Sequence, residues 1–286
     1  MVKQIGIDNE IFKSEEYLND KYLFAIFEKK IKDRNARIYS DEENYIIVNE
    51  DDNRAPWIWT KDGLDNLVLK EIEEAIMLFM NKDKMPFTCK KELYEMLIND
   101  DFELIDKDDY FEMGFMRCRK LKDTKENDGV LSRANLEDKD ILARYIMAFE
   151  EFMDESAKDY HPNSDGEMIK HCHDRALEEI KNDKFFVLRN SNNKIVSMAH
   201  YKTSSDGTAK IGLVYTPEEE RGKGYAAKIV HDITAILLDD NYIPVLYTDQ
   251  NYPNSNIAYF NAGYENGGTL VNFSCNKNLK RTMNRW

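Results

Sequence analysis

Residues 210–230 are the most informative segment of the sequence and read Lys210-Ile-Gly-Leu-Val-Tyr-Thr-Pro-Glu-Glu-Glu-Arg-Gly-Lys-Gly-Tyr-Ala-Ala-Lys-Ile-Val230. Its first part, Ile211 to Thr216, is rich in apolar and β-branched residues and predicts a buried strand. A proline and three glutamates end this strand. Two glycines follow, and then apolar residues recur at helical spacing from Ile229 to Leu237. A strand, a glycine-containing turn and a helix N-terminus together favour a site for an anion such as a pyrophosphate.

The two glycines by themselves are not specific for a phosphate. A glycine pair before a helix is also found in ordinary tight turns. The turn is not a Walker loop, because no Gly-Lys-Ser/Thr follows at the required spacing. It is not a dinucleotide-binding fingerprint, because the third glycine is missing. From spacing alone, a phosphate site and a structural turn both remain open.

Two segments resemble signature motifs of the GCN5-related N-acetyltransferase (GNAT) family. Arg221, Gly224 and Ala226 match the motif Arg/Gln-x-x-Gly-x-Gly/Ala. The segment from Tyr247 to Tyr264 is similar to the second signature, Asn-Pro-x-Ser-Asn-x-x-Tyr-x-x-x-Gly-Phe/Tyr. The two motifs occur in the family's order, separated by one helix and one strand. The resemblance covers about residues 129–275 and implies an α+β fold, with a mixed, largely antiparallel sheet flanked by helices.

The resemblance implies that the ligand is acetyl-CoA or a close acyl-CoA. It implies that backbone amides from Gly222 to Ala227 hold the pyrophosphate, and that the main chain of Leu213 to Tyr215 binds the pantetheine arm. Tyr259 matches the family's tyrosine that donates a proton to the leaving thiolate, and a phenol with a pKa of about 10 suits that role. The residues expected at the cofactor are Leu213, Val214, Tyr215, Arg221, Gly222, Lys223, Gly224, Tyr225, Ala226, Ala227 and Asn256.

The sequence departs from the family in two places. A carboxylate on the central strand is a frequent general base in the family, but Lys210 to Thr216 carries none. His200, Tyr201, Asp249 or a chain of water molecules are the alternatives. Tyr252 stands where the family has an asparagine that contacts CoA. Two functions are therefore left to distinguish: N-acetyl transfer to a primary amine by direct attack, and a non-catalytic CoA-binding or regulatory protein that keeps the fold.

The N-terminal part of the chain predicts a second domain, since 286 residues suffice for two. Residues 1–121 predict an α/β domain, with helices at Tyr17 to Ile31 and Leu67 to Phe79, and contain no glycine-rich strand-to-helix turn. Its order of elements is similar to that of a degenerate acetyltransferase-like domain, and an unrelated α+β domain is the alternative. Residues 122–128 are polar and predict a linker. Residues 129–286 predict the catalytic domain.

The composition restricts the partners. A net charge of −14 argues against nucleic acid and anionic membrane surfaces, and is compatible with an amine-bearing acceptor. No apolar run is long enough to span a bilayer. The N-terminus lacks a leader-like pattern and the four cysteines are scattered, so we expect a cytoplasmic protein with reduced thiols. The side chains of His171, Cys172 and His173 diverge on a helix, so we expect no metal site.

Overall fold

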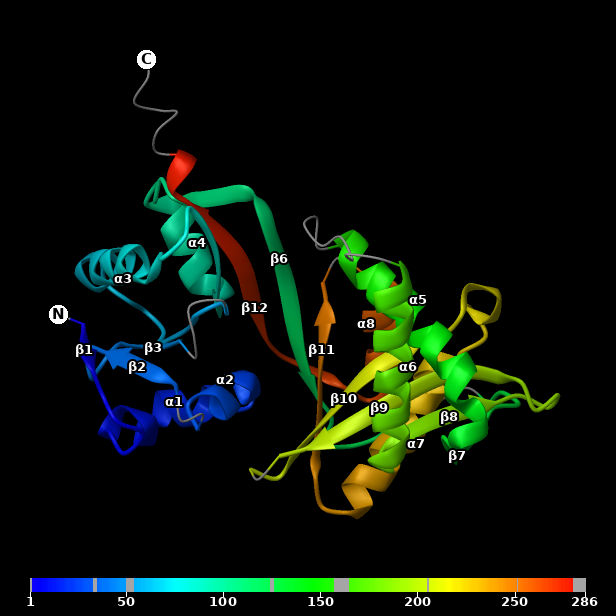
Figure 1. The fold of residues 1–286 in the computed structure, drawn as a ribbon. Coiled ribbons are helices and arrows are strands. Elements are labelled where there is room, and N and C mark those ends of the chain that lie inside the picture. Colours follow the sequence, from blue (N-terminus) through cyan, green and yellow to red (C-terminus); the bar gives the residue numbers. More distant parts are fainter. Residues whose placement is uncertain are drawn as a thin grey trace. The chain divides into compact units, whose positions relative to one another are not determined.

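The computed structural model describes residues 2–32, 35–49, 54–123, 126–156, 165–204, 206–250 and 252–279. Figure 1 shows the course of the chain as a ribbon. In chain order the elements are β1 (Lys3–Gln4), η1 (Glu10–Lys13), α1 (Glu15–Asp20), α2 (Ala25–Lys30), β2 (Arg37–Ser40), β3 (Tyr45–Asn49), β4 (Trp57–Thr60), α3 (Asn66–Phe79), β5 (Lys84–Lys90), α4 (Lys91–Asn99), β6 (Ile105–Arg117), β7 (Val130–Arg133), η2 (Leu136–Asp138), α5 (Lys139–Ser156), α6 (Asp165–Lys181), β8 (Phe185–Arg189), β9 (Ile195–Thr203), β10 (Thr208–Tyr215), η3 (Glu218–Glu220), α7 (Tyr225–Asp239), β11 (Ile243–Asp249), α8 (Pro253–Ala262) and β12 (Glu265–Asn276). The predicted fold class, a mixed and largely antiparallel sheet with flanking helices, is confirmed.

The chain divides into two compact units whose boundaries differ from the sequence-based division. Unit 1 comprises Met1–Phe115, Asp249–Asn251 and Gly267–Trp286, and unit 2 comprises Met116–Thr248 and Tyr252–Asn266. The sequence analysis placed residues 129–286 together, whereas the C-terminal residues cluster with the N-terminal ones. The reason is β12, where Leu270 to Asn276 pair antiparallel with Lys90 to Lys84 of β5. Both β6 and β12 therefore carry the chain from one unit into the other.

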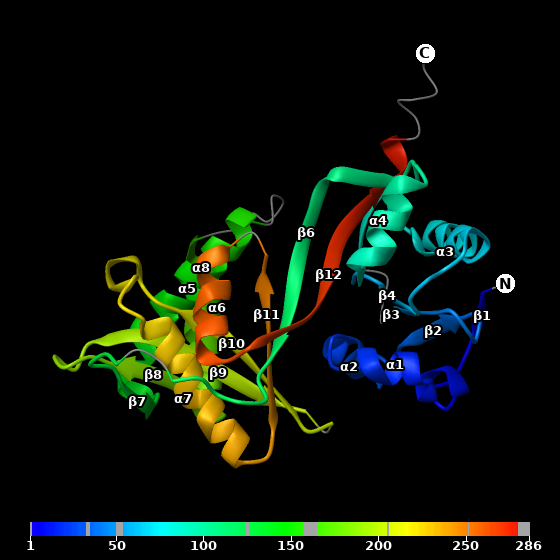
Figure 2. The same cartoon turned by 180° about the vertical axis from the view of Figure 1, so that it is seen from behind.

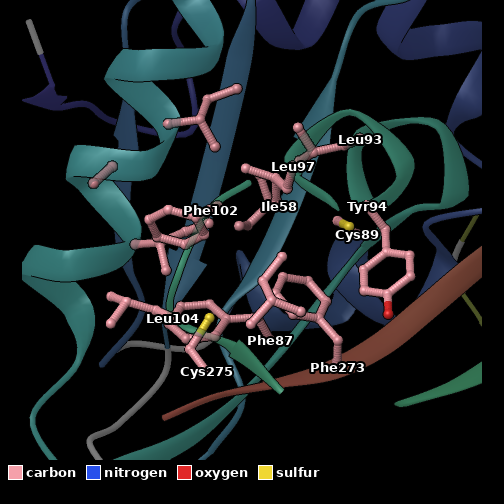
Figure 3. Packing of buried hydrophobic residues seen from close by; sticks show 14 of the residues in the cluster. Ile58, Phe87, Cys89, Leu93, Tyr94, Leu97, Phe102, Leu104, Phe273 and Cys275 are labelled. Atoms are coloured by element: carbon pink, nitrogen blue, oxygen red, sulfur yellow. The ribbon is translucent and has the colours of Figure 1, made fainter. Parts of the chain in front are cut away.

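Unit 1 is built on strands in the order β1-β2-β3-β4-β5-β12-β6. Its core includes Phe87 of β5 and Phe273 of β12, whose rings stack with centroids 5.9 Å apart, and Tyr94 of α4, whose ring lies 5.4 Å from that of Phe273. Figure 3 shows these rings together with Cys275 and apolar side chains from α4 and the strands. The single helix predicted at Tyr17 to Ile31 is instead two short helices, α1 and α2, separated by a turn.

Unit 2 contains the strand order β11-β10-β9-β8-β7. The strands are antiparallel except for β10 and β11, which are parallel. Helices α5 and α6 cover one face of this sheet, and α7 and α8 cover the other (Figures 1 and 2). Asn135 caps the short helix η2 that precedes α5, and its side chain accepts a hydrogen bond from the amide of Glu137.

The two units share one order of elements. In each, a parallel strand pair is connected through a helix: β4-α3-β5 in unit 1 and β10-α7-β11 in unit 2. In unit 1 this segment is followed by helix α4 and the long strand β6. The segment of unit 2 is followed in the same way by helix α8 and the long strand β12. This repetition supports the hypothesis that residues 1–121 have an acetyltransferase-like arrangement.

Candidate functional site

The turn before α7 leaves the N-terminus of that helix open. Gly222 and Gly224 have φ values of 78° and 81°, in the left-handed region that glycine adopts most readily. Gly224 is the N-cap of α7, and no side chain of the described residues caps the helix there. The first amides of a helix have no acceptor within the helix, and the helix dipole makes this end positive. The amides from Gly222 to Ala227, predicted to hold a pyrophosphate, thus lie where an anion is favoured.

The corresponding helix of unit 1, α3, begins differently. Its N-cap is Asp65, whose carboxylate accepts hydrogen bonds from the amides of Leu67 and Val68, both at 2.9 Å. A capping carboxylate satisfies amides that a ligand phosphate would otherwise bind, and its charge repels an anion. Unit 1 therefore shares the order of elements but fills the end of its helix with its own side chain.

The charged side chains of the unit 2 turn hold one another in place. Glu220 is buried, and its two carboxylate oxygens accept from Nζ of Lys194 at 2.8 Å and Nζ of Lys223 at 2.7 Å. Nε of Arg221 donates to the carbonyl oxygen of Thr216 at 3.2 Å. The side chains of Arg221 and Lys223 thus fix the turn itself, and the turn offers a ligand its backbone amides. The sequence analysis missed Glu220, because nothing distinguishes it from its two glutamate neighbours.

The end of the predicted linker contacts the same turn. Residues 124 and 125 lie outside the described residues, but the hydroxyl of Tyr225 donates to Asp128 at 2.6 Å. This hydrogen bond and those from Ser191 lower the pKa of Asp128 to about 2. The side-chain amide of Asn127 lies 3.5 Å from the carbonyl oxygen of Lys223. Sequence reasoning missed these contacts because the polar composition of the segment is typical of any linker.

Strand β10 leaves its regular pairing where the pantetheine contacts are predicted. Its register with β9 shifts between Gly212 and Tyr215, so that two residues of β10, Leu213 and Val214, face one residue of β9. Leu213 adopts a φ of 49°, which is unusual for a branched residue. The parallel pairing with β11 ends at Lys210 within the described residues. A bulged segment of this kind can form main-chain hydrogen bonds with an extended ligand.

Tyr259 lies on α8, in the core between the sheet and α7. Its side chain is buried, and burial raises its pKa to about 12. The phenol is therefore protonated at neutral pH, as a proton donor must be. The hydroxyl of the neighbouring Tyr264 is already engaged in a hydrogen bond with Oγ1 of Thr234, at 2.7 Å. Asn256 lies three residues before Tyr259 on the same helix and is half-buried.

The face of the unit 2 sheet that α5 and α6 cover holds a buried pair formed by a carboxylate and an imidazole. Oε2 of Glu179 on α6 lies 2.9 Å from Nδ1 of His200 on β9, and Oε1 lies 3.0 Å from Nζ of Lys202. Burial alone would raise the pKa of Glu179, but the hydrogen bonds and charges of His200 and Lys202 outweigh burial and lower its pKa to about 2. The sequence analysis considered His200 as a base but did not connect it with Glu179. The other candidates are placed differently: Tyr201 packs on the α7 face, and Asp249 belongs to unit 1.

Among the described residues, no group of three or more histidine, cysteine, aspartate or glutamate side chains has the arrangement of a metal site. Within the same part of the chain, no helix is both long enough and apolar enough to cross a bilayer.

Comparison with known proteins agrees with this geometry. The acetyltransferase (GNAT) family model matches residues 147–264, which include the α7 turn and Tyr259. A search of curated proteins found no significant match. Among solved structures, a GNAT-family acetyltransferase from Colwellia psychrerythraea is 13% identical with a TM-score of 0.57, over 96% of this chain and 99% of that chain. A GCN5-related N-acetyltransferase from Kribbella flavida is 12% identical with a TM-score of 0.53, over 95% of this chain and 96% of that chain.

A third structure resembles the chain over nearly its whole length. It is a tandem GNAT protein from the clavulanic acid biosynthesis pathway, 9% identical with a TM-score of 0.51, and the match covers 97% of this chain and 98% of that chain. At such identities the structures show a shared fold. The family match assigns residues 147–264 to the GNAT family, as the two sequence motifs within them implied, and the solved structures show the same fold. The arrangement in two units fits a tandem GNAT fold.

Proposed function

We propose that this protein transfers an acetyl group from acetyl-CoA to a primary amine by direct attack of the amine on the thioester. The observation that carries the proposal is the uncapped N-terminus of α7, which follows the bulged strand β10 through two glycines with positive φ. The residues present fit the cofactor, because a Cβ atom built on Gly222 meets nothing within 4 Å among the described residues. The turn is therefore open at the position where a phosphate approaches the amides.

Each predicted residue has a role in this proposal. Amides from Gly222 to Ala227 hold the pyrophosphate, and the side chains of Arg221, Lys223 and Tyr225 keep the turn in shape. The main chain of Leu213, Val214 and Tyr215 binds the pantetheine arm and polarises the thioester carbonyl. Asn256 contacts the polar part of the cofactor. Tyr259 protonates the departing thiolate.

A binding experiment tests the cofactor site. Saturating acetyl-CoA at about 100 times its Kd should stabilise the protein by about 2.7 kcal/mol, seen as a higher Tm. Gly224→Asp places a carboxylate at the N-cap of α7, and should abolish the shift because the new charge occupies the amides. Gly63→Asp is the matched control, since Gly63 also has a positive φ, of 71°; a Cβ atom there meets nothing within 4 Å, and one at Gly224 meets only the side-chain amide of Asn127, at 3.4 Å. An unchanged Tm of the wild type with acetyl-CoA contradicts the proposal.

The alternative is a GNAT domain that binds CoA without catalysis. It is favoured by β10, which carries no carboxylate from Thr208 to Tyr215. The two functions are distinguished by incubating the protein and acetyl-CoA with amines of several classes, including polyamines, aminoglycosides and lysine peptides, and measuring the free thiol released. Release that depends on the amine supports transfer. Binding without release from any amine supports the non-catalytic function.

We also propose that unit 1 is a degenerate GNAT-like domain that does not hold acetyl-CoA. The β4-α3-β5 order supports the relationship, and Asp65 at the N-cap of α3 supports the loss of the phosphate site. Lys90, at the end of β5, is buried and pairs with Asp20 and Asp62, each at 2.7 Å.

A cytoplasmic location also remains a proposal. It is supported by the free cysteines Cys89, Cys118, Cys172 and Cys275.

A further inference from the structure

We propose that His200 is the general base of unit 2 and that Glu179 is its positioning residue; this inference rests on the acetyl transfer proposed above. An amine acceptor is mostly protonated at neutral pH and must lose a proton before it can attack the thioester. Strand β10 offers no carboxylate for this purpose. The imidazole of His200, on the neighbouring strand β9, occupies the space that a side chain on β10 would otherwise fill. There it can act as the base that β10 does not supply.

Gly212 provides the space that the imidazole of His200 occupies. It is the β10 residue directly opposite His200, and it immediately precedes the bulge. A Cβ atom built on Gly212 would lie 2.9 Å from Nε2 of His200 and 3.3 Å from its Cδ2. Apart from Gly212 and its two chain neighbours, no other atom of the described residues lies within 4 Å of that position. The absence of a side chain at Gly212 therefore leaves room for the Nε2 edge of the buried imidazole to lie over β10.

The position is next to the predicted reaction centre. The pairing of β10 with β11 ends at Lys210, and the register shift with β9 begins at Gly212. The backbone of Leu213 to Tyr215, proposed to bind the pantetheine arm and the thioester carbonyl, starts one residue further along. Neighbouring strands lie only about 5 Å apart, so a side chain that leans from β9 over Gly212 reaches the point where the strands diverge.

Glu179 orients the imidazole. Its Oε2 atom lies 2.9 Å from Nδ1, which is an ion-pair contact whose angle is not that of a hydrogen bond. A carboxylate at Nδ1 favours the tautomer with its proton on Nδ1, which leaves the lone pair on Nε2, the nitrogen that faces Gly212. Lys202 holds the other carboxylate oxygen at 3.0 Å, and the ring of Phe185 packs against the imidazole with centroids 6.5 Å apart. The imidazole is thus fixed by α6, β8 and β9 together.

Nε2 of His200 accepts one proton from the ammonium group of the acceptor. The lone pair of the neutral amine then forms the C–N bond with the thioester carbonyl carbon. On collapse, the C–S bond breaks and its electron pair leaves on sulfur, which takes the phenolic proton of Tyr259. The nitrogen loses its second proton to solvent, and the phenolate regains a proton from solvent. The imidazolium of His200 then releases its proton to solvent, which restores the base. An amide, free CoA and one released proton result.

Three substitutions and one control test the inference. His200→Gln should lower kcat/KM for the best amine of the panel on the order of 10²-fold, since a general base contributes at least that much. Glu179→Gln should cause a smaller loss, of about tenfold, because the imidazole is still present. Gly212→Ala should resemble His200→Gln, because its methyl group meets Nε2. His173→Gln, on the same helix as Glu179 but partly exposed, should leave activity unchanged.

Two further measurements separate a catalytic role from a structural one. Hydroxylamine is already neutral at pH 7, so His200→Gln should lower its acetylation by less than about threefold if the residue acts as a base. An equal loss with both nucleophiles overturns the inference. In addition, the NMR signal of the His200 ring should shift when acetyl-CoA binds to the wild type. This signal is assigned by its absence from the spectrum of His200→Gln. An unshifted His200 signal with bound acetyl-CoA overturns the inference whether or not an amine is accepted.

Calorimetry distinguishes this inference from the proposed function. If the wild type does not bind acetyl-CoA, the proposed function fails and the inference fails with it. If the wild type and His200→Gln bind acetyl-CoA within about twofold of each other, while only the variant loses amine acetylation, both stand. If His200→Gln binds and acetylates like the wild type, the proposed function stands and His200 is not the base.

Discussion

Phe273→Ala should destabilise unit 1, although residue 273 lies far along the chain in the segment that the sequence assigned to the C-terminal domain. The side chain is fully buried, stacks on Phe87 at 5.9 Å and contacts Tyr94 at 5.4 Å. Replacing such a phenylalanine by alanine removes its burial and leaves a cavity, at a cost of about 3–5 kcal/mol. Since about 1.4 kcal/mol corresponds to a factor of ten, amide exchange through opening of unit 1 should accelerate roughly 10²- to 4 × 10³-fold.

Hydrogen exchange read by mass spectrometry locates the effect. In Phe273→Ala, peptides from β5 and α4 should lose protection, while peptides from β8 to β10 should exchange as in the wild type. Phe186→Ala is the matched control, since Phe186 is buried in unit 2 and stacks on Tyr201 at 6.0 Å. It should show the opposite pattern. Loss of protection in β8 to β10 rather than in β5 and α4 of Phe273→Ala would refute the assignment of β12 to unit 1.

Three further predictions concern the candidate site. Calorimetry should give one acetyl-CoA per chain, because Asp65 caps α3 in unit 1; two sites would contradict the proposed degeneracy. Tyr259→Phe should lower kcat on the order of 10²-fold while acetyl-CoA still binds, and a loss below about threefold in steady-state kinetics would exclude the donor role. Folding lowers the pKa of Glu179 to about 2, so its charged form stabilises the protein above its ordinary pKa and that stabilisation disappears as the pH falls toward 2. Urea unfolding between roughly pH 5 and pH 3 should therefore show a steeper loss of stability in the wild type than in Glu179→Gln, and parallel curves would contradict the pairing.

The site could be predicted from sequence where its chemistry is local. The strand, turn and helix around Arg221 to Ala226 lie in one continuous segment, and glycine at two positions signals the positive φ values that the structure shows. Such features depend on residues a few positions apart, which the sequence displays directly.

The rest depends on contacts between distant residues. Residues Thr269 to Ser274 predict a strand, but nothing in them specifies β5 as the partner, because hydrophobic patterning sets the buried face and not the neighbour. Glu179 and His200 are separated by a turn and a strand, and they meet only when α6 packs on the sheet. Glutamate is common on exposed helix faces, so its burial beside an imidazole cannot be read from its type.

The position of β12 has a consequence for the order in which the chain can fold. Domains generally fold as units during synthesis, beginning with the N-terminal one. Here the strand that pairs with β5 and supplies Phe273 to the core of unit 1 is synthesised only after unit 2, which lies between β6 and β12 in the sequence. Unit 1 therefore cannot complete its core until β12 has been synthesised, and the apolar edge around Phe87 stays uncovered until then. Dividing the gene at residues 122–128 would consequently produce a first fragment that lacks part of its own core.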